Sequence, residues 1–256
     1  MENLFDLTGK VAVAIGGNST LGAAMAKGLA EQGAKVAIVG RNLEKAEEVT
    51  KEIEASGGIA KSFQADVSDM ETVKKAAAEI EDWAGGWDIV LNAPGKNSTT
   101  PFFELDPEEW DDIMNVNLKG LVFTIQLFAK KMVEQNRKGS IINVSSASSN
   151  IPLSKVFTYS ASKAGVNNIT QFLAREFAPH GIRVNAIVPG FFPAVQNRKI
   201  MDEARIESIM NHTPMKRFGE PEELKGAAIY LASDKASGYV TGSFLRVDGG
   251  YLSMTI

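Results

Sequence analysis

The sequence predicts an α/β protein with one doubly wound parallel sheet of about seven strands and helices on both faces. First, short apolar runs alternate with helix-forming stretches about every 25 residues, which is typical of parallel strands joined by helices. Second, a glycine-rich turn at residues 16–22 separates the first apolar run from an alanine-rich helical stretch. Third, no repeat, low-complexity segment or linker interrupts the 256 residues, so we expect a single domain over residues 1–256.

Local signals predict the individual elements. Apolar runs that end in turn residues predict strands at 10–15, 36–39, 60–65, 87–92, 139–146, 182–188 and 243–247. Helices are predicted at 23–32, 42–56, from 68 or 69 to about 83, from 106 to 135, at 159–178 and from 220 onward. Residues 194–219 are a long polar and basic insertion, and insertions of this length are usually lids or binding elements. We expect residues 190–219 to form the substrate loop.

The composition excludes several classes of function. A formal net charge of −4 provides no basic field for a nucleic-acid backbone. The chain has no cysteine, and its two histidines, His180 and His212, lack the spacing of a zinc motif. No apolar run approaches the ~20 residues of a membrane span, and the first residues lack a basic signal region. We therefore expect a cytoplasmic protein that binds no metal, nucleic acid or membrane.

Tyr159 and Lys163 form the most informative pair. Because they are four residues apart on a predicted helix, their side chains share one face. An ammonium ~4 Å from the phenol contributes roughly 4 kcal/mol at intermediate dielectric, which would lower the phenol pKa by up to about three units. This predicts an acid–base catalyst that works near neutral pH. Alone, the spacing is also compatible with an ordinary surface tyrosine and lysine.

The glycine-rich turn predicts a seat for the pyrophosphate of a dinucleotide, since it presents backbone N–H groups at the positive end of a helix. Thr20 stands where a second glycine is usual, and its hydroxyl or that of Ser19 could cap the helix instead. Gly22 allows close packing of the helix on the strand. The residues expected to contact the cofactor here are Gly16, Asn18, Ser19, Thr20, Leu21 and Gly22.

The end of the second strand indicates which dinucleotide binds. NAD sites usually have an acidic residue there to hold the ribose, whereas this chain has Gly40 followed by Arg41, a cation suited to a 2′-phosphate. We therefore expect NADP, with NAD possible. Asp66, at the end of the third strand, is placed to accept hydrogen bonds from an adenine amino group, or it serves only as a cap.

These features together resemble the short-chain dehydrogenase/reductase family, and the resemblance covers essentially the whole chain. The matching segments are residues 16–22, Asp66-Val67, residues 92–95, Asn117, Ser146, Tyr159 with Lys163, Pro189-Gly190 and residues 247–250. The resemblance implies a Rossmann-type fold, an NAD(P) cofactor and a homotetramer. The small residues that begin the helix at Tyr159 and the apolar tail at 251–256 are consistent with that assembly.

The resemblance also implies hydride transfer between nicotinamide C4 and a carbonyl or alcohol carbon. Tyr159 would exchange a proton with the substrate oxygen, and Ser146 would hydrogen-bond that oxygen. Lys163 would bind the nicotinamide ribose and lower the Tyr159 pKa, and Asn117 would hold a water that extends the proton relay. From the residues alone, Asn117 either faces solvent or marks a kink in its helix. Further cofactor contacts are expected from Val67, Asn92, Ala93, Gly95, Pro189 and Gly190.

The chain departs from the family pattern at three places. Ile15 and Thr20 replace a threonine and the middle glycine, and Ala93-Pro94 replaces an asparagine–alanine pair. These changes bear on the affinity and pose of the cofactor rather than on the chemistry.

Within the family, residues 189–198 and 212–219 resemble the branch that acts on sugar acids, such as D-mannonate/D-fructuronate oxidoreductases. After the aromatic Phe192, Arg198 could hold a carboxylate with two parallel hydrogen bonds while Gln196 and Asn197 satisfy hydroxyls. The alternative is a solvated start of a helix. We therefore expect a small-molecule substrate, specifically a sugar acid.

Two other functions stay open. The nearest is a 3-oxoacyl-carrier reductase or a gluconate-type dehydrogenase of the same family. The other, of a different class, is a non-catalytic protein that senses dinucleotides, because fold alone does not decide function. Retention of Asn117, Ser146, Tyr159 and Lys163 together argues against a sensor, which has no need of a proton relay.

Overall fold

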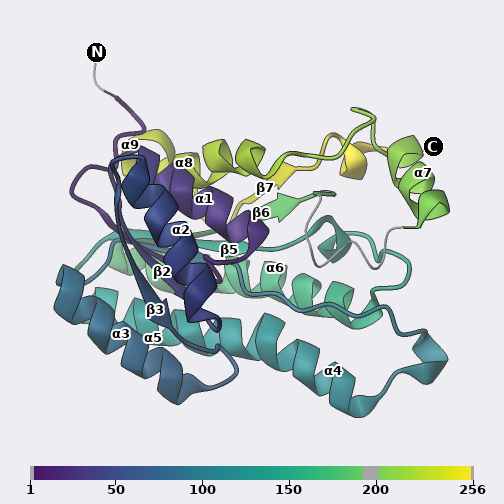
Figure 1. Cartoon of the computed structure of the whole chain (residues 1–256), viewed down its shortest axis with the longest axis horizontal. Coiled ribbons are helices and arrows are strands. Elements are labelled where there is room, and N and C mark those ends of the chain that lie inside the picture. Colours follow the sequence, from purple (N-terminus) through teal and green to yellow (C-terminus); the bar gives the residue numbers. More distant parts are fainter. Residues whose placement is uncertain (1–2, 193–201, 255–256) are drawn as a thin grey trace.

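The chain winds outward twice from the middle of one sheet. The computed structural model describes residues 3–192 and 202–254, and its seven parallel strands have the order β3-β2-β1-β4-β5-β6-β7 (Figure 1). The strands are β1 (Val11–Ile15), β2 (Lys35–Gly40), β3 (Ile59–Gln64), β4 (Ile89–Asn92), β5 (Gly139–Val144), β6 (Ile182–Pro189) and β7 (Phe244–Val247). The order reverses between β1 and β4, and crevices at such reversals are where ligands bind in open α/β sheets. The predicted fold class is confirmed.

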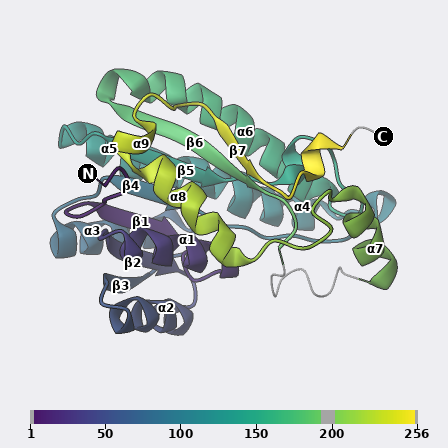
Figure 2. The same cartoon turned by 90° about the horizontal axis from the view of Figure 1, so that it is seen from above.

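Helices cover both faces of the sheet (Figure 2). On one face lie α1 (Thr20–Glu31), α2 (Leu43–Ala55) and α8 (Lys225–Ala232), and on the other lie α3 (Met70–Ala84), α5 (Leu121–Glu134) and α6 (Phe157–Phe177). Alternate residues of a strand point to opposite faces. In β1, accordingly, Ala12 and Ala14 pack in the first core, while Val11, Val13 and Ile15 pack in the second. Burial on both faces explains why the strands read as continuous apolar runs.

The helix expected from 106 to 135 is divided into three parts. It consists of α4 (Pro107–Met114), a π-helical stretch (Asn115–Gly120) and α5. At the end of the π-helical stretch a Cβ on Gly120 would lie 2.5 Å from the carbonyl oxygen of Val67, so the chain passes too close there for any side chain. The irregularity that Asn117 could mark is therefore present as the π-helical stretch, and the alternative that Asn117 faces solvent is wrong, since this residue is fully buried.

The polar insertion contains a helix of its own, α7 (Glu203–His212), which the sequence did not predict. Asp202 caps this helix by accepting a hydrogen bond from the Arg205 N–H at 2.8 Å. Gln196, Asn197 and Arg198, the expected substrate contacts, lie outside the described residues. A short helix, α9 (Asp234–Ser237), lies between α8 and β7 in the chain.

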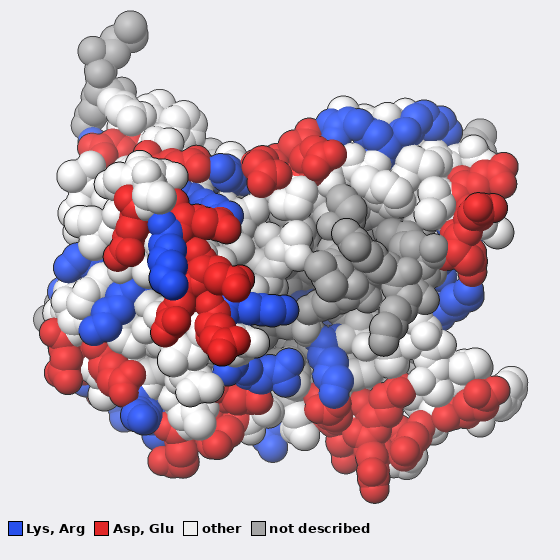
Figure 3. All heavy atoms as spheres, in the orientation of Figure 1, with Lys and Arg blue, Asp and Glu red and all other residues white. Residues whose placement is uncertain are grey.

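Charged side chains of both signs are interspersed on the face seen in Figure 3. Over residues 3–192 and 202–254, no helix is long and apolar enough to cross a membrane. Over the same ranges, no group of three or more His, Asp or Glu side chains is arranged to hold a metal ion.

Candidate active site

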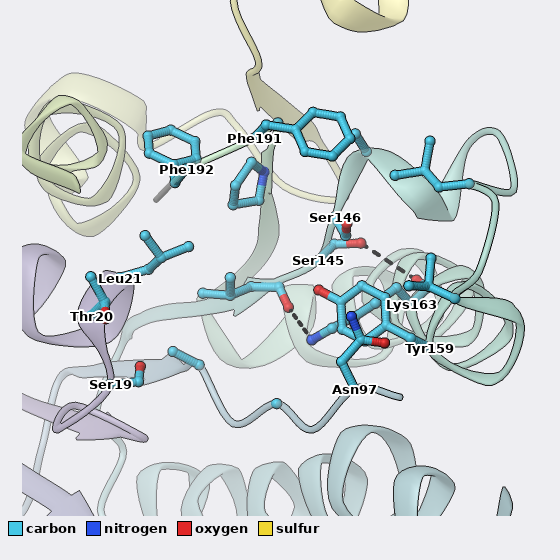
Figure 4. Close-up of a pocket in the computed structure, with 18 of the residues that line it drawn as sticks. Ser19, Thr20, Leu21, Asn97, Ser145, Ser146, Tyr159, Lys163, Phe191 and Phe192 are labelled. Carbon is cyan, nitrogen blue, oxygen red and sulfur yellow. Dashed lines mark hydrogen bonds between the residues drawn. The ribbon is translucent and has the colours of Figure 1, made fainter. Parts of the chain in front are cut away.

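Tyr159 and Lys163 lie on the first turns of α6, at the carboxyl edge of the sheet (Figure 4). The Lys163 side chain is almost completely buried, with 2% of its surface exposed. Its Nζ donates to the carbonyl oxygen of Val144 at 2.8 Å and to that of Pro94 at 3.5 Å. The ammonium therefore lies against the ends of β4 and β5 and is 5.7 Å from the centre of the Tyr159 ring.

The expected lowering of the Tyr159 pKa is wrong for the protein without cofactor. Burial raises the pKa of this phenol, and only a hydrogen bond with the Ser146 side chain opposes the rise. Burial also lowers the pKa of Lys163 from 10.5 to about 8. The sequence argument placed the ammonium next to the phenol oxygen in a partly polar medium. It did not include desolvation, which disfavours both charged forms.

Ser146 follows β5 and starts a short 3₁₀ turn, Ala147–Ser149. Its Oγ accepts a hydrogen bond from the Ser148 N–H at 3.2 Å, which fixes the side chain beside the tyrosine. The preceding Ser145 points to α6 instead, where its hydroxyl donates to Asn167 at 2.6 Å. Ser146 and Tyr159 thus lie within hydrogen-bonding reach of each other, and Ser145 supports the turn from the side of α6.

Asn117 holds the loop that follows β4. Its Oδ1 accepts from the Lys96 N–H at 2.8 Å, and its Nδ2 donates to the Lys96 carbonyl at 2.9 Å and to the Ser162 hydroxyl at 3.0 Å. Ser162 in turn donates to the Tyr159 carbonyl at 2.7 Å. Asn117 thus connects the loop after β4 to the helix that carries the tyrosine. One acceptor position of Oδ1 remains for the water that the resemblance implies.

The glycine-rich turn is closed by contacts that need glycine. Gly16 has φ of +71°, and a Cβ there would lie 2.7 Å from the Ala93 carbonyl oxygen. Gly22 packs directly against Gly16, where a Cβ would collide with the carbonyl oxygen. The residue that caps α1 is Ser19, whose Oγ accepts from the Gly22 N–H at 3.2 Å, so Thr20 is the first residue of the helix rather than its cap.

The ends of β2 and β3 bring Arg41 and Asp66 together. Arg41 Nη1 is 3.8 Å from an Asp66 carboxylate oxygen, and two thirds of the arginine side chain is exposed. The side chain of Asn18 fills the space over Gly40, where any Cβ would collide with it, and donates to the Asn42 carbonyl at 3.0 Å. Since Asn18 precedes the capping serine, this cationic corner adjoins the glycine-rich turn.

A single cleft joins the α1 turn to the Tyr159 helix (Figure 4). The predicted residues that line it are Ser19, Thr20, Leu21, Ala93, Gly95, Ser146, Tyr159, Lys163, Pro189, Gly190 and Phe192. Those that do not are Gly16, Asn18, Gly22, Arg41, Asp66, Val67, Asn92 and Asn117. In this second group, Gly16 and Gly22 shape the glycine-rich turn, and Asn18, Arg41 and Asp66 lie at the cationic corner beyond it. Val67, Asn92 and Asn117 are buried.

Three polar residues of the cleft were not predicted from the sequence. Ser145 lines it at the end of β5, Asn97 reaches it from the loop after β4, and Arg205 reaches it from α7. The Arg205 guanidinium donates to the Ser154 hydroxyl at 3.2 Å and to the Ser154 carbonyl at 2.9 Å, which ties α7 to the loop before α6. A second tie, between Lys155 and Asp202 at 3.2 Å, lies beside it. No local motif marks Asn97 or Arg205, although Arg205 lies within the expected substrate loop.

Comparison with known proteins supports this architecture over almost the full length. A family model described as enoyl-(acyl carrier protein) reductase matches residues 15–252. An oxidoreductase of Bacillus subtilis, UxuB, whose activity is uncharacterized, is 39% identical over 97% of this chain and 96% of its own length. An acetoacetyl-CoA reductase of Synechocystis is 40% identical over 96% of this chain and 97% of its own.

Solved structures agree with the fold closely. A gluconate 5-dehydrogenase from Burkholderia cenocepacia, in complex with NADP and tartrate, superposes with a TM-score of 0.93, at 35% identity over 98% of both chains. A protein from Haemophilus influenza assigned as a D-mannonate oxidoreductase, with bound NAD, gives a TM-score of 0.92 at 36% identity over 99% of both chains. By fold, cleft and sequence, this chain belongs to the short-chain dehydrogenase/reductase family of NAD(P)-dependent oxidoreductases.

Proposed function

We propose that the protein interconverts a ketone and a secondary alcohol of a sugar acid, with NADP(H) as the hydride carrier. One observation supports this proposal most strongly. Among the described residues of the cleft, Lys163 and Arg205 carry positive charge and none is an aspartate or glutamate. The catalytic tyrosine therefore lies in a cleft that favours an anionic substrate, in a protein whose formal net charge is negative.

The residues present fit a dinucleotide. The cleft leads from the first turn of α1, where backbone N–H groups suit a pyrophosphate, to Lys163, whose ammonium has three N–H groups and two acceptors given above. The third N–H is available to a ribose hydroxyl. Arg41 lies at the far corner, where it would bind a 2′-phosphate in place of its contact with Asp66. A bound nicotinamide supplies the hydride that is added to the carbonyl carbon, and the oxidised cofactor leaves.

Tyr159 supplies the proton in the reductive direction. Its pKa is raised by burial, so the phenol is protonated at neutral pH and can donate to the carbonyl oxygen as the hydride arrives. Ser146, hydrogen-bonded to the same phenol, would hold that oxygen in place. Lys163, whose Nζ is 5.7 Å from the centre of the tyrosine ring, would bind the nicotinamide ribose. A water that donates a hydrogen bond to Asn117 Oδ1 would return a proton from solvent to Tyr159.

Arg205 and the relatives support the proposed substrate class. Arg205 lies next to the loop that leads into α6, so its charge belongs to the tyrosine end of the cleft rather than to the pyrophosphate end. A guanidinium there can hold a substrate carboxylate while Tyr159 meets the ketone. The gluconate 5-dehydrogenase and the protein assigned as a D-mannonate oxidoreductase are named for sugar acids. We also propose that residues 1–256 act as one domain and assemble as a homotetramer.

A substrate panel tests this proposal. The purified enzyme would be given 5-keto-D-gluconate, D-fructuronate and acetoacetyl-CoA, each with NADPH and with NADH, and loss of the reduced nicotinamide would be followed. We expect the highest kcat/KM with a keto acid and NADPH. Preference for acetoacetyl-CoA would instead support an acyl reductase, like the Synechocystis relative. No turnover of any ketone would support a dinucleotide sensor.

A further inference from the structure

Asn167 of α6 connects the two serines that lie before and after Ser146. Its Oδ1 accepts a hydrogen bond from the Ser145 hydroxyl at 2.6 Å, and its Nδ2 donates to the Ser149 hydroxyl at 2.8 Å. Ser145 follows the last residue of β5, and Ser149 ends the 3₁₀ turn that begins after Ser146. One amide therefore holds both sides of the segment that carries Ser146.

The contact reaches Ser146 itself through Ser149. The Ser149 hydroxyl donates to the Ser146 carbonyl oxygen at 2.6 Å, a shorter contact than the one to Asn150 Oδ1 at 3.3 Å. The Ser149 N–H donates to the same carbonyl oxygen at 3.0 Å. Because the Asn167 amide donates to the Ser149 oxygen, the single proton of that hydroxyl points away from the amide and toward Ser146. Hydrogen bonds chained in this way strengthen one another.

Asn167 lies outside the cleft. The described residues that line the cleft include Ser145 and Ser146 but not Asn167. Ser146, in contrast, is hydrogen-bonded to the Tyr159 phenol inside the cleft (Figure 4). Its Oγ also accepts from the Ser148 N–H at 3.2 Å, so the hydroxyl follows the backbone of the turn. Any effect of Asn167 on the reaction must pass through the residues that it holds.

We propose that Asn167 is a positioning residue that sets the place of the Ser146 hydroxyl relative to the Tyr159 phenol. This inference rests on the proposed function, in which both hydroxyls act on one substrate oxygen. Tyr159, Lys163 and Asn167 follow one another at four-residue intervals, so their side chains form one row along α6. By tying the turn to this row, Asn167 makes the position of Ser146 depend on the helix that carries the tyrosine. A misplacement of ~1 Å at a reacting centre can lower the rate about 100-fold.

A double-mutant cycle tests the proposal. Asn167→Leu removes both hydrogen bonds at similar volume, and we expect it to lower kcat by about 10- to 100-fold while KM for NADPH stays within about threefold. Ser146→Ala removes the hydroxyl itself and should lower kcat by about 100- to 1000-fold. Once that hydroxyl is gone, its position no longer matters. Asn167→Leu in the Ser146→Ala protein should therefore lower kcat by less than about threefold.

Asn168→Leu is the matched control, because Asn168 is the next residue of α6 and its side chain is exposed. It should leave kcat unchanged with and without the Ser146 hydroxyl. The midpoint of thermal unfolding, measured for every variant, shows whether each protein is folded at the assay temperature. Asn167→Ala, which removes the same hydrogen bonds, replaces Asn167→Leu in the cycle if the leucine variant does not fold.

Equal losses of kcat from the Asn167 substitution in the two backgrounds would refute the positioning role. A lower unfolding midpoint with unchanged kcat would refute it as well, since Asn167 would then only stabilise the fold. The cycle uses the ketone that the substrate panel shows to be reduced fastest. Preference for acetoacetyl-CoA would thus overturn the proposed substrate class, while the cycle would still decide the role of Asn167. If no ketone is reduced, both proposals fail.

Discussion

Replacing Lys163 with methionine would test whether the active-site amine has the low pKa that its burial indicates. Methionine fills a similar volume without a charge. In the folded protein burial lowers the Lys163 pKa from 10.5 to about 8. This shift in pKa means that holding the charged amine in the folded protein costs roughly 3 kcal/mol relative to the unfolded chain. Wild-type protein is destabilised by this amount below pH 8, where the amine is charged in both states.

The sign follows from proton binding. Between pH 8 and pH 10.5 the unfolded chain holds a proton on Lys163 that the folded chain has released, so stability rises with pH over this window. The variant has no such group, and its other ionisable groups are those of the wild type. The free energy of unfolding of wild-type protein minus that of Lys163→Met should therefore increase by about 2 kcal/mol from pH 7 to pH 9.5.

Urea denaturation of the cofactor-free proteins at several pH values, at one protein concentration, measures this difference. Lys130→Met serves as the control, because Lys130 is a lysine of α5 whose side chain is 74% exposed. The difference in unfolding free energy between wild type and Lys130→Met should stay constant over the same pH range. If the difference in unfolding free energy between wild type and Lys163→Met also stays constant with pH, the amine of Lys163 does not have a lowered pKa. The argument from its burial against the carbonyl groups of Val144 and Pro94 then fails.

Four further outcomes are expected. Tyr159→Phe should abolish turnover but retain NADPH binding, as measured by nicotinamide fluorescence; a variant with most of the wild-type kcat would contradict the assignment of the proton donor. Arg41→Ala should raise KM for NADPH by about 10- to 100-fold and change KM for NADH little, and an equal effect on both would remove the 2′-phosphate role. Arg205→Ala should raise KM for 5-keto-D-gluconate by about 10- to 100-fold but leave KM for an uncharged hydroxyketone unchanged. Arg175→Ala, at an exposed arginine, is the control, and an equal rise of KM for both substrates would give Arg205 a structural role only. Light scattering at micromolar concentration should show a homotetramer, and a monomer would count against it.

The local pattern of the sequence determined the architecture and the central pair of the site. Seven apolar runs, each followed by a turn, gave seven parallel strands in the expected places, because burial on both faces requires continuous apolar residues. The turn at residues 16–22 was recognisable since glycine positions depend on the local backbone. The four-residue spacing of Tyr159 and Lys163 is a property of one helix, so it too could be read without the fold.

Only the tertiary structure decided the properties that depend on residues distant in the chain. The sequence could not show that the loop after β4 and the end of β5 would present the carbonyl groups of Pro94 and Val144 to Lys163. It also could not show that burial would reverse the expected shift of the Tyr159 pKa. Nor could it show that Asn97 and Arg205, which lie on separate elements, share one cleft. Desolvation and charge in a site are set by everything that packs around it, and that packing exists only when the whole chain is folded.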